Sequence, residues 1–148
     1  MNIRQLSVFL ENRPGQLRAP VKVLGEAGID ILSLSLADTQ QFGILRIVVK
    51  DPERAKRLLE AAGLVVNVTD VLAVDVPDEP GGLARVLEAF EKVGLGVEYM
   101  YAFAGGRERG RRATLLVRVE DPERASGLLA REGVKLVPSA ELFVRVGA

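Results

Sequence analysis

Two short segments carry the residues best suited to hold a small molecule. In the first, Asn12 and the turn Pro14-Gly15 precede a helical pattern, and Pro80-Gly81 stands in the same place in the second. A helix N-terminus has unpaired backbone N–H groups and partial positive charge, which suits a carboxylate or another small anion. The Asn12 side chain can donate to a carboxylate and accept from an ammonium. The alternative is a Pro-Gly turn with a capped helix and no ligand.

Binding is favoured over catalysis by what the chain lacks. Its 148 residues include no Cys and no His. Disulfides and thiolate or imidazole metal sites are therefore excluded, and no metal or cofactor is expected. The side chain best suited to proton transfer near neutral pH is also absent. Enzymes can work with Asp, Glu, Lys or Tyr alone, so the composition lowers the expectation of an enzyme without removing it.

The charge balance and hydropathy argue against nucleic-acid and membrane partners. Twenty basic and twenty acidic residues give a net charge of zero, which argues against a broad phosphate-binding surface. No stretch approaches the roughly 20 apolar residues of a membrane span. The N-terminus enters a strand pattern directly, without a signal-peptide pattern. A cytoplasmic protein is the expectation.

The chain is duplicated. Pro80 follows Pro14 by 66 residues, whereas the motif Asp-Pro-Glu-Arg-Ala recurs at Asp51 and Asp121 with a spacing of 70 residues. Repeats of this length are two copies of a small domain, expected here at residues 1–68 and 69–148. The spacing difference predicts a four-residue insertion in the second copy within 105–112. Its Arg107-to-Arg112 run is expected to be a solvated hairpin tip, the alternative being a site for an acidic partner or a phosphate.

Both copies show the element order β-α-β-β-α-β. In the second helix of each copy, Asp51 and Asp121 are expected to cap the N-terminus, followed by Pro at the first helical position. Pro20 is expected to make a turn of the first helix irregular. The pattern predicts an α+β fold of two ferredoxin-like domains, each with a four-stranded antiparallel sheet and both helices on one face. Strands are expected at 3–10, 29–36, 43–49, 72–76, 95–103, 113–119 and 140–146, and helices at 15–27, 52–62, 82–93 and 122–131.

Two features predict how these domains associate. Val65 to Val76 reads as almost continuous strand, so the two halves are expected to be coupled without a linker. The open sheet faces are expected to be apolar, because Leu32, Leu34 and Leu36 lie on the face opposite Ile29, Ile31 and Ser33. Either the two halves merge into one large sheet with a covered face, or another chain covers it. A bare apolar face of that size is unusual on a monomer, which predicts a homodimer.

The order of the motifs resembles one known family. Glu-Asn-Arg-Pro-Gly-x-Leu over 11–17 followed by Gly-Ile-Asp-Ile over 28–31 is similar to the ACT domain, most closely to regulatory domains of the phosphoglycerate dehydrogenase type. The segments 33–39, 42–46, 68–71 and 97–101 resemble small stand-alone proteins of two ACT domains. The resemblance covers essentially the whole chain and implies an amino-acid-binding module that regulates a metabolic enzyme.

The resemblance also implies where a ligand would bind. In the family the ligand lies where two ACT domains meet, between the first loop of one and the start of the second strand of its neighbour. Asn12 matches the loop Asn, and Asp30 stands where the family often has Asn. The matching positions of the second copy are Asp78 and Gly96, so the first copy is the better candidate. The expected ligand-binding residues are Asn12, Arg13, Pro14, Gly15, Gln16, Leu17, Asp30, Ile31, Asp78, Pro80, Gly81, Gly82, Leu83, Tyr99 and Tyr101.

Some of these roles have open alternatives. The backbone N–H groups of Gly15, Gln16 and Leu17 would hold a carboxylate, whereas Tyr99 and Tyr101 would either pack or form a pocket wall. Arg46, in an otherwise apolar strand, needs a carboxylate from the protein or from a ligand.

Three functions compete. The leading hypothesis is a regulatory sensor that binds a free amino acid without catalysis. The second is an interaction module that assembles with a metabolic enzyme and has no ligand. The third is an enzyme on the same topology, such as an acylphosphatase-like hydrolase, for which a net-neutral loop is thin support. RNA binding is disfavoured because Gly43 to Val49 lacks aromatic residues that could stack on bases.

Overall fold

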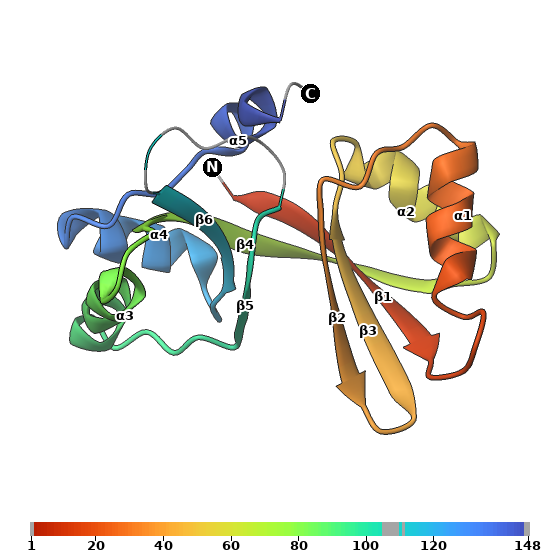
Figure 1. Cartoon of the computed structure of the whole chain (residues 1–148), viewed down its shortest axis with the longest axis horizontal. Coiled ribbons are helices and arrows are strands. Elements are labelled where there is room, and N and C mark those ends of the chain that lie inside the picture. The colour runs from red at the N-terminus through yellow and green to blue at the C-terminus, as the bar shows by residue number, and fades with distance from the viewer. Residues whose placement is uncertain (1, 105–109, 111, 147–148) are drawn as a thin grey trace. The chain divides into compact units, whose positions relative to one another are not determined.

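A computed structural model describes residues 2–104, 110 and 112–146 of the chain (Figure 1). It divides into two compact units. We call Arg4–Thr69 the N-terminal unit, and the described residues of Met1–Ile3 with Asp70–Ala148 the C-terminal unit. The expected domain ranges 1–68 and 69–148 stay a prediction.

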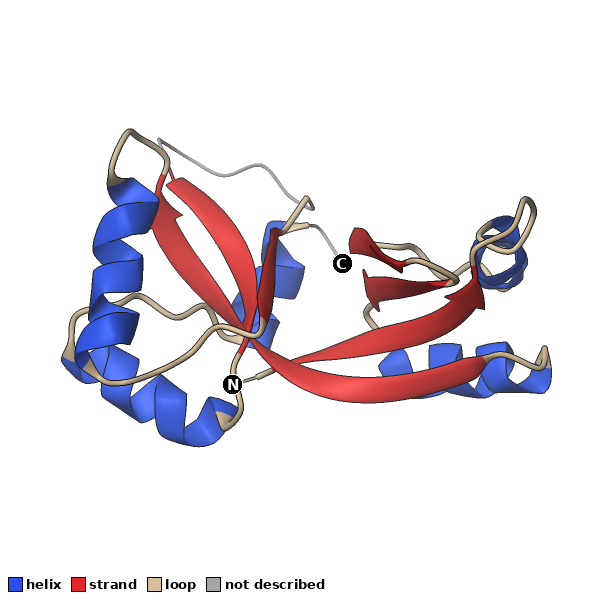
Figure 2. Ribbon diagram, turned by 90° about the horizontal axis from the view of Figure 1, so that it is seen from below, coloured by secondary structure: helices blue, strands red, loops and turns tan. Residues whose placement is uncertain are grey.

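The described strands follow the order β2-β3-β1-β4-β6-β5. The pairs β2–β3, β3–β1, β4–β6 and β6–β5 are antiparallel. β4 belongs to both units and is a single unbroken strand (Figure 2), as its apolar pattern predicted. The elements are β1 (Ile3–Glu11), α1 (Arg18–Glu26), β2 (Ser33–Thr39), β3 (Phe42–Val48), α2 (Pro52–Ala61), β4 (Val65–Pro77), α3 (Gly82–Lys92), β5 (Tyr99–Ala102), β6 (Arg112–Arg118), α4 (Pro122–Arg131) and α5 (Ser139–Arg145).

In the N-terminal unit, one face of the sheet packs on α1 and α2. Alternate residues of β1 and β3 form a core with Leu24 of α1 and Leu59 of α2, both fully buried. Removing these apolar side chains from water is the main stabilising term of such a layer. The strand residues of this core are Leu6, Val8, Leu10, Leu45, Ile47 and, from β4, Val66.

The leucines of β2 lie on this same helix side of the sheet. Leu34 is opposite Ile47 and Leu36 is opposite Leu45, and residues in register share a face. The expectation that these leucines line the open face is therefore wrong. Their exposure is real, however, at 54% for Leu34 and 52% for Leu36, because β2 is an edge strand of the sheet.

The second helix of each copy begins as the sequence predicted. Asp51 Oδ1 accepts a hydrogen bond of 3.1 Å from the Arg54 N–H, and Asp121 Oδ1 accepts one of the same length from Arg124. Proline occupies the first helical position in both. These caps satisfy one of the backbone donors that a helix N-terminus leaves unpaired.

Several boundaries differ from the expected ones for local reasons. α1 begins at Arg18 rather than at Gly15, which places Pro20 in the first turn, where its missing N–H costs no helical hydrogen bond. β2 begins at Ser33 rather than Ile29, because the Ile29 N–H donates to Leu24 O at 2.9 Å and completes the end of α1. The Leu95 N–H donates likewise to Phe90 O at 2.9 Å, and β5 begins only at Tyr99.

In the C-terminal unit, α3 and α4 cover one face of the sheet, as α1 and α2 do in the N-terminal unit. Val74, Val117, Phe90 of α3 and Leu129 of α4 belong to its core. The expected last strand over 140–146 is wrong, since Ser139–Arg145 forms α5. A short stretch pairs with β4 instead, with a bridge between Val74 and Leu136.

α5 lies on the face opposite to α3 and α4. Its Arg145 Nη1 donates to Thr114 Oγ1 at 3.2 Å, and Thr114 is in register with Asp75, between the core positions of β4. Leu142 of α5 is fully buried, and Arg145 pairs with Glu141 one turn earlier at 2.8 Å. Burial of this leucine and the i, i+4 ion pair stabilise the helix. The apolar run of the segment had instead suggested a strand. Both expected helices, α3 and α4, pack on one face of this unit, and α5 is an additional helix on the other face that the sequence did not predict.

Candidate functional site

The loop from Glu11 to Leu17 joins β1 to α1 and is tied to the β2–β3 hairpin. The Asn12 N–H donates to Gln41 O at 2.9 Å, and its Nδ2 donates to Gln40 O at 3.3 Å. No residue that the structure describes donates a hydrogen bond to the amide oxygen of Asn12. Arg13 forms an ion pair with Glu11 in which both side chains are more than half exposed. The loop is therefore held by the hydrogen bonds of Asn12 to the hairpin, and the charged side chains of Glu11 and Arg13 are exposed to solvent.

One of the three expected backbone donors for a ligand is used within the turn itself. Gly15 has φ +86°, a left-handed conformation that favours glycine, and a Cβ there would meet nothing within 4 Å. The Gln16 N–H, in contrast, donates to Arg13 O at 3.2 Å. The expectation that Gln16 offers its N–H to a carboxylate is therefore wrong. Leu17 has no side-chain cap of its own at the start of α1.

Two hollows flank this loop. A cavity of about 300 Å³ lies toward the helix side, with Leu10 and Leu17 as apolar walls and Asn12 and Arg13 at its polar end. A wider hollow of about 430 Å³ lies toward the hairpin tip and also includes Asn12 and Arg13. We call the 300 Å³ cavity the first-loop cavity. Its complete lining is Leu10, Glu11, Asn12, Arg13, Leu17, Leu36, Ala37, Asp38 and Gly43.

Asp38 and Leu36 are wall residues of the first-loop cavity that sequence reasoning did not select. Both come from β2, and Asp38 is in register with Gly43 of β3. The alternation of β2 carried the signal, because it places Leu36 and Asp38 on one face. With Asp38, the cavity has a carboxylate as well as the Asn12 amide and the Arg13 guanidinium.

Asp30 and Ile31 do not line the first-loop cavity. β1 and β2 are both antiparallel to β3, so they run in the same direction. Asn12 follows the end of β1, whereas Asp30 precedes the start of β2, at the opposite end of these strands (Figure 1). Within one unit the two residues therefore belong to different ends of the sheet.

The corresponding loop of the second copy packs closely against the end of β4, although Pro77 and Gly82 also line a cavity that is described below. A Cβ on Gly82 would lie 2.0 Å from Pro77 O, so the backbone of α3 approaches β4 more closely than a side chain allows. Gly81 has φ +83°, and α3 begins immediately after it. Arg85 closes over the loop with a 2.6 Å ion pair to Glu79. Asp78 and Pro80 belong to this tighter loop, and Leu83 is the second residue of α3.

Tyr99 and Tyr101 are half-buried residues of β5. Tyr101 is in register with Leu116 and Tyr99 with Arg118 of β6, on the face away from α3 and α4. Neither tyrosine lines the cavity of the C-terminal unit described next. Arg46 of β3 is half-buried and in register with Ser7 and Ser35, on the face of its unit away from the helices.

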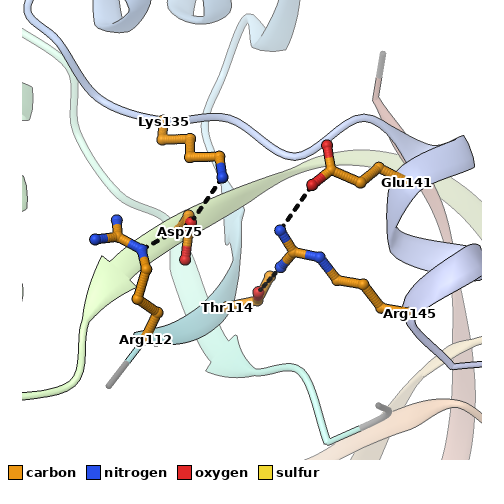
Figure 3. Close-up of polar contacts among 6 residues, drawn as sticks. All are labelled: Asp75, Arg112, Thr114, Lys135, Glu141 and Arg145. Atoms are coloured by element: carbon orange, nitrogen blue, oxygen red, sulfur yellow. Dashed lines mark hydrogen bonds and ion pairs between the residues drawn. The ribbon is translucent and has the colours of Figure 1, made fainter. Parts of the chain in front are cut away.

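The C-terminal unit holds a buried acid between two cations (Figure 3). Asp75 is 3% exposed, and its Oδ2 is 2.9 Å from Arg112 Nε and 3.4 Å from Lys135 Nζ. Oδ1 is buried and accepts no hydrogen bond from the described part of the chain. A cavity of about 210 Å³ adjoins this cluster and is lined also by Arg85 and Glu132. Sequence reasoning did not find this cluster, because its members are far apart in the chain.

Other expectations are partly outside the described residues. The expected insertion and arginine run include 105–109 and 111, which the structure does not describe. Arg112, the last residue of that run, lies in β6 and pairs with Asp75 rather than forming part of a solvated tip. Residues 2–104, 110 and 112–146 contain no cluster of three potential metal-ligating side chains. No helix in these ranges is long and apolar enough to cross a membrane.

The chain belongs to the family of ACT domain pairs, whose model matches residues 1–145. This confirms the resemblance drawn from the sequence motifs. The fold is correspondingly an α+β ACT domain pair, with five helices and a six-stranded antiparallel sheet among the described residues. No curated protein matches the chain at a significant level.

Solved structures share this fold. Protein BT0572 from Bacteroides thetaiotaomicron is 34% identical, with a TM-score of 0.86 over 97% of this chain and 96% of its own. The regulatory subunit of aspartate kinase from Thermus thermophilus, in a ligand-free form, is 17% identical with a TM-score of 0.62 over 88% of this chain and 91% of its own. The corresponding subunit from Thermus flavus is 16% identical with a TM-score of 0.63 over 88% and 90%.

Proposed function

We propose that this protein is a regulatory sensor that binds a free amino acid at the first-loop cavity and performs no catalysis. The observation that carries this proposal is the composition of that cavity. It combines the Asn12 amide and the Arg13 guanidinium with the Asp38 carboxylate in about 300 Å³. An α-amino acid needs donors for its carboxylate and an acceptor for its ammonium, and these groups supply both.

In this proposal the ligand lies along the loop. Its carboxylate accepts hydrogen bonds from the N–H groups of Gly15 and Leu17, at the uncapped start of α1, and pairs with Arg13. The Asn12 oxygen and Asp38 face the ammonium. The apolar walls Leu10 and Leu36 then contact the amino-acid side chain, and these walls favour a ligand that is not strongly polar at that end.

A second copy of the chain would complete this site. β2 is an edge strand, and two such strands paired antiparallel about a two-fold axis would place the end of one beside the start of the other. Because the first-loop cavity lies at the end of β2, Asp30 of the partner subunit would approach it. This is the arrangement that the family resemblance implies, with Asp30 adding a second carboxylate for the ammonium.

The dimer has a direct test. Leu34 and Leu36 are 54% and 52% exposed, and we expect them to be buried between paired β2 strands. Light scattering of the unmodified chain at micromolar concentration should give twice its 16.0 kDa mass. The double change Leu34→Lys and Leu36→Lys should give a monomer, because the charges would be buried in the interface. The control Val65→Lys, at a position 64% exposed on β4, should remain a dimer.

A 16.0 kDa species for the unmodified chain would contradict the dimer. A dimer that survives both leucine substitutions would show that copies associate elsewhere. In either case Asp30 could not reach the first-loop cavity through the β2 edge.

The second candidate is an assembly module without a ligand, whose partner is a metabolic enzyme. The likeness of the fold to regulatory subunits of aspartate kinase is compatible with both candidates. A thermal-shift screen with each of the twenty amino acids at millimolar concentration separates them. A ligand that binds only the native state must raise its melting temperature, so at least one amino acid should do so. A screen with no shift would favour the assembly module.

The remaining features of the proposal concern architecture and setting. Each copy would form one ACT domain, 1–68 and 69–148, and the short pairing at Leu136 would take the place of a fourth strand in the second. The protein would act in the cytoplasm on a separate enzyme, without nucleic acid, membrane, metal or cofactor. The second loop, with Asp78, Pro80 and Gly81, and Leu83 at the start of α3, would be the weaker of the two amino-acid sites.

A further inference from the structure

In the C-terminal unit, the single negative charge of the buried Asp75 is paired with two positively charged side chains. Asp75 Oδ2 is shared by Arg112 Nε at 2.9 Å and Lys135 Nζ at 3.4 Å. The other charged residues of the adjoining cavity have partners of their own. Arg85 pairs with Glu79 at 2.6 Å, and Glu132 pairs with Lys92 at 2.5 Å. One positive charge at the cavity is therefore left without a counter-charge among the described residues.

The unused donors of this cluster are directed away from the acid. Arg112 reaches Asp75 through Nε, and its two terminal nitrogens point away from the carboxylate (Figure 3). Among the described residues these nitrogens have no acceptor, and Lys135 Nζ has no contact besides Asp75. The side chains of Arg112 and Lys135 are 42% and 55% exposed, so a solute can reach them.

The burial of Asp75 fixes both cations in place. Lys135 lies on the short stretch that pairs with β4, and its carbonyl oxygen accepts a hydrogen bond of 2.9 Å from the Asp75 N–H. Arg112 is held from the other side by the pairing of β6 with β4, opposite Pro77. Both cations are held by the same carboxylate oxygen, because Arg112 Nε and Lys135 Nζ both contact Asp75 Oδ2. The geometry is that of an acid that positions two donors.

We propose that this cavity of about 210 Å³ binds a small oxyanion, a phosphate or a carboxylate, held by Arg112 and Lys135. Guanidinium and ammonium groups side by side are suited to this chemistry, because each makes charge-assisted hydrogen bonds to oxyanions. The site lies wholly within the C-terminal unit, between α3, β4 and the residues that follow α4. It is separate from the first-loop cavity and does not depend on amino-acid binding there.

Calorimetry on the full-length chain tests the site, with inorganic phosphate and succinate as separate probes at constant ionic strength. We expect saturable binding of at least one probe at concentrations up to about 10 mM, with chloride giving none. Lys135→Gln and Arg112→Gln should each weaken binding about tenfold or more, since each removes a charge-assisted hydrogen bond. Lys135→Arg should retain most of the affinity. Tighter binding of phosphate would identify a phosphoryl ligand, and tighter binding of succinate a carboxylate.

The matched control is Lys22→Gln. Lys22 is 56% exposed, like Lys135 at 55%, but it lies on α1 of the other unit, so its loss should leave the affinity unchanged. Circular dichroism on every variant shows whether it is folded. The proposal is overturned if the unmodified chain binds neither probe, or if Lys135→Gln and Arg112→Gln bind as tightly as Lys22→Gln. These outcomes are distinct from failure of the amino-acid screen, because the Lys135→Gln and Arg112→Gln variants assign the binding of phosphate or succinate to the C-terminal unit.

Discussion

Gly82→Ala is expected to destabilise the protein by roughly 3 kcal/mol, the largest effect that we expect of any single methyl group. A Cβ at this position would lie 2.0 Å from Pro77 O and 3.0 Å from the Pro77 carbonyl carbon. Both are backbone atoms, so no side-chain rotation can relieve the contact. The start of α3 or the end of β4 must shift, which loosens the core that holds Phe90 against β4. Urea unfolding of the variant and the unmodified chain measures the loss.

Gln16→Ala is the matched control, because Gln16 occupies the same place after Pro-Gly in the first copy. The first copy already carries a side chain there, so we expect a change within about 0.5 kcal/mol. If Gly82→Ala were as stable as Gln16→Ala, the close approach of α3 to β4 would be wrong, and the second loop would be as open as the first.

Asp30→Ala is expected to weaken amino-acid binding about 10- to 100-fold, whereas Asp78→Ala should change it little. Loss of one charge-assisted hydrogen bond typically costs about 1.5–3 kcal/mol, which corresponds to that range. In the proposed dimer, Asp30 of the partner subunit faces the ligand ammonium at the first-loop cavity. Asp78 belongs to the second loop, where Gly82 leaves no space beside Pro77. Isothermal titration calorimetry with the amino acid found by thermal shift compares the variants.

The comparison also separates the two carboxylates of the first site. Asp38→Ala should weaken binding whether or not the chain dimerises, because Asp38 lines the cavity of its own copy. Asp30→Ala should act only in the dimer, so its effect should disappear in the Leu34→Lys and Leu36→Lys background. Equal losses for Asp30→Ala and Asp78→Ala would mean that the two copies contribute alike. A loss at Asp78 alone would place the ligand in the second copy.

Local signals explain what could be predicted from the sequence. The Asp-Pro starts of α2 and α4 are short-range features, and both Asp side chains make the expected cap. The continuous apolar pattern before Val76 predicted β4, which runs from Val65 to Pro77. The duplication and the loop motif together identified the family over residues 1–145. The caps and the strand pattern need only residues near one another in the chain, and the duplication is recognised by matching two such short motifs.

Features that depend on tertiary contacts were missed. α5 resembles a strand in its apolar run, and only burial of Leu142 and the Arg145–Thr114 contact, across 31 residues, identify it as a helix. The cluster around Asp75 joins residues 37 apart and more, so no spacing rule predicts it. The prediction of the sheet face on which Leu34 and Leu36 lie was also wrong, because that face is determined by the pairing of β2 with β3.

The central claim is that a free amino acid binds at the loop between β1 and α1. Backbone amide chemical-shift mapping by NMR tests it most directly, with the ¹⁵N-labelled full-length chain and an equimolar mixture of the twenty amino acids. We expect the largest shifts at Asn12, Gly15 and Leu17, with Asp38 and Asp30 also affected and the amides of Gly81 and Gly82 nearly unchanged. Shifts confined to Gly81 and Gly82, or no shifts at any loop amide, would contradict the account.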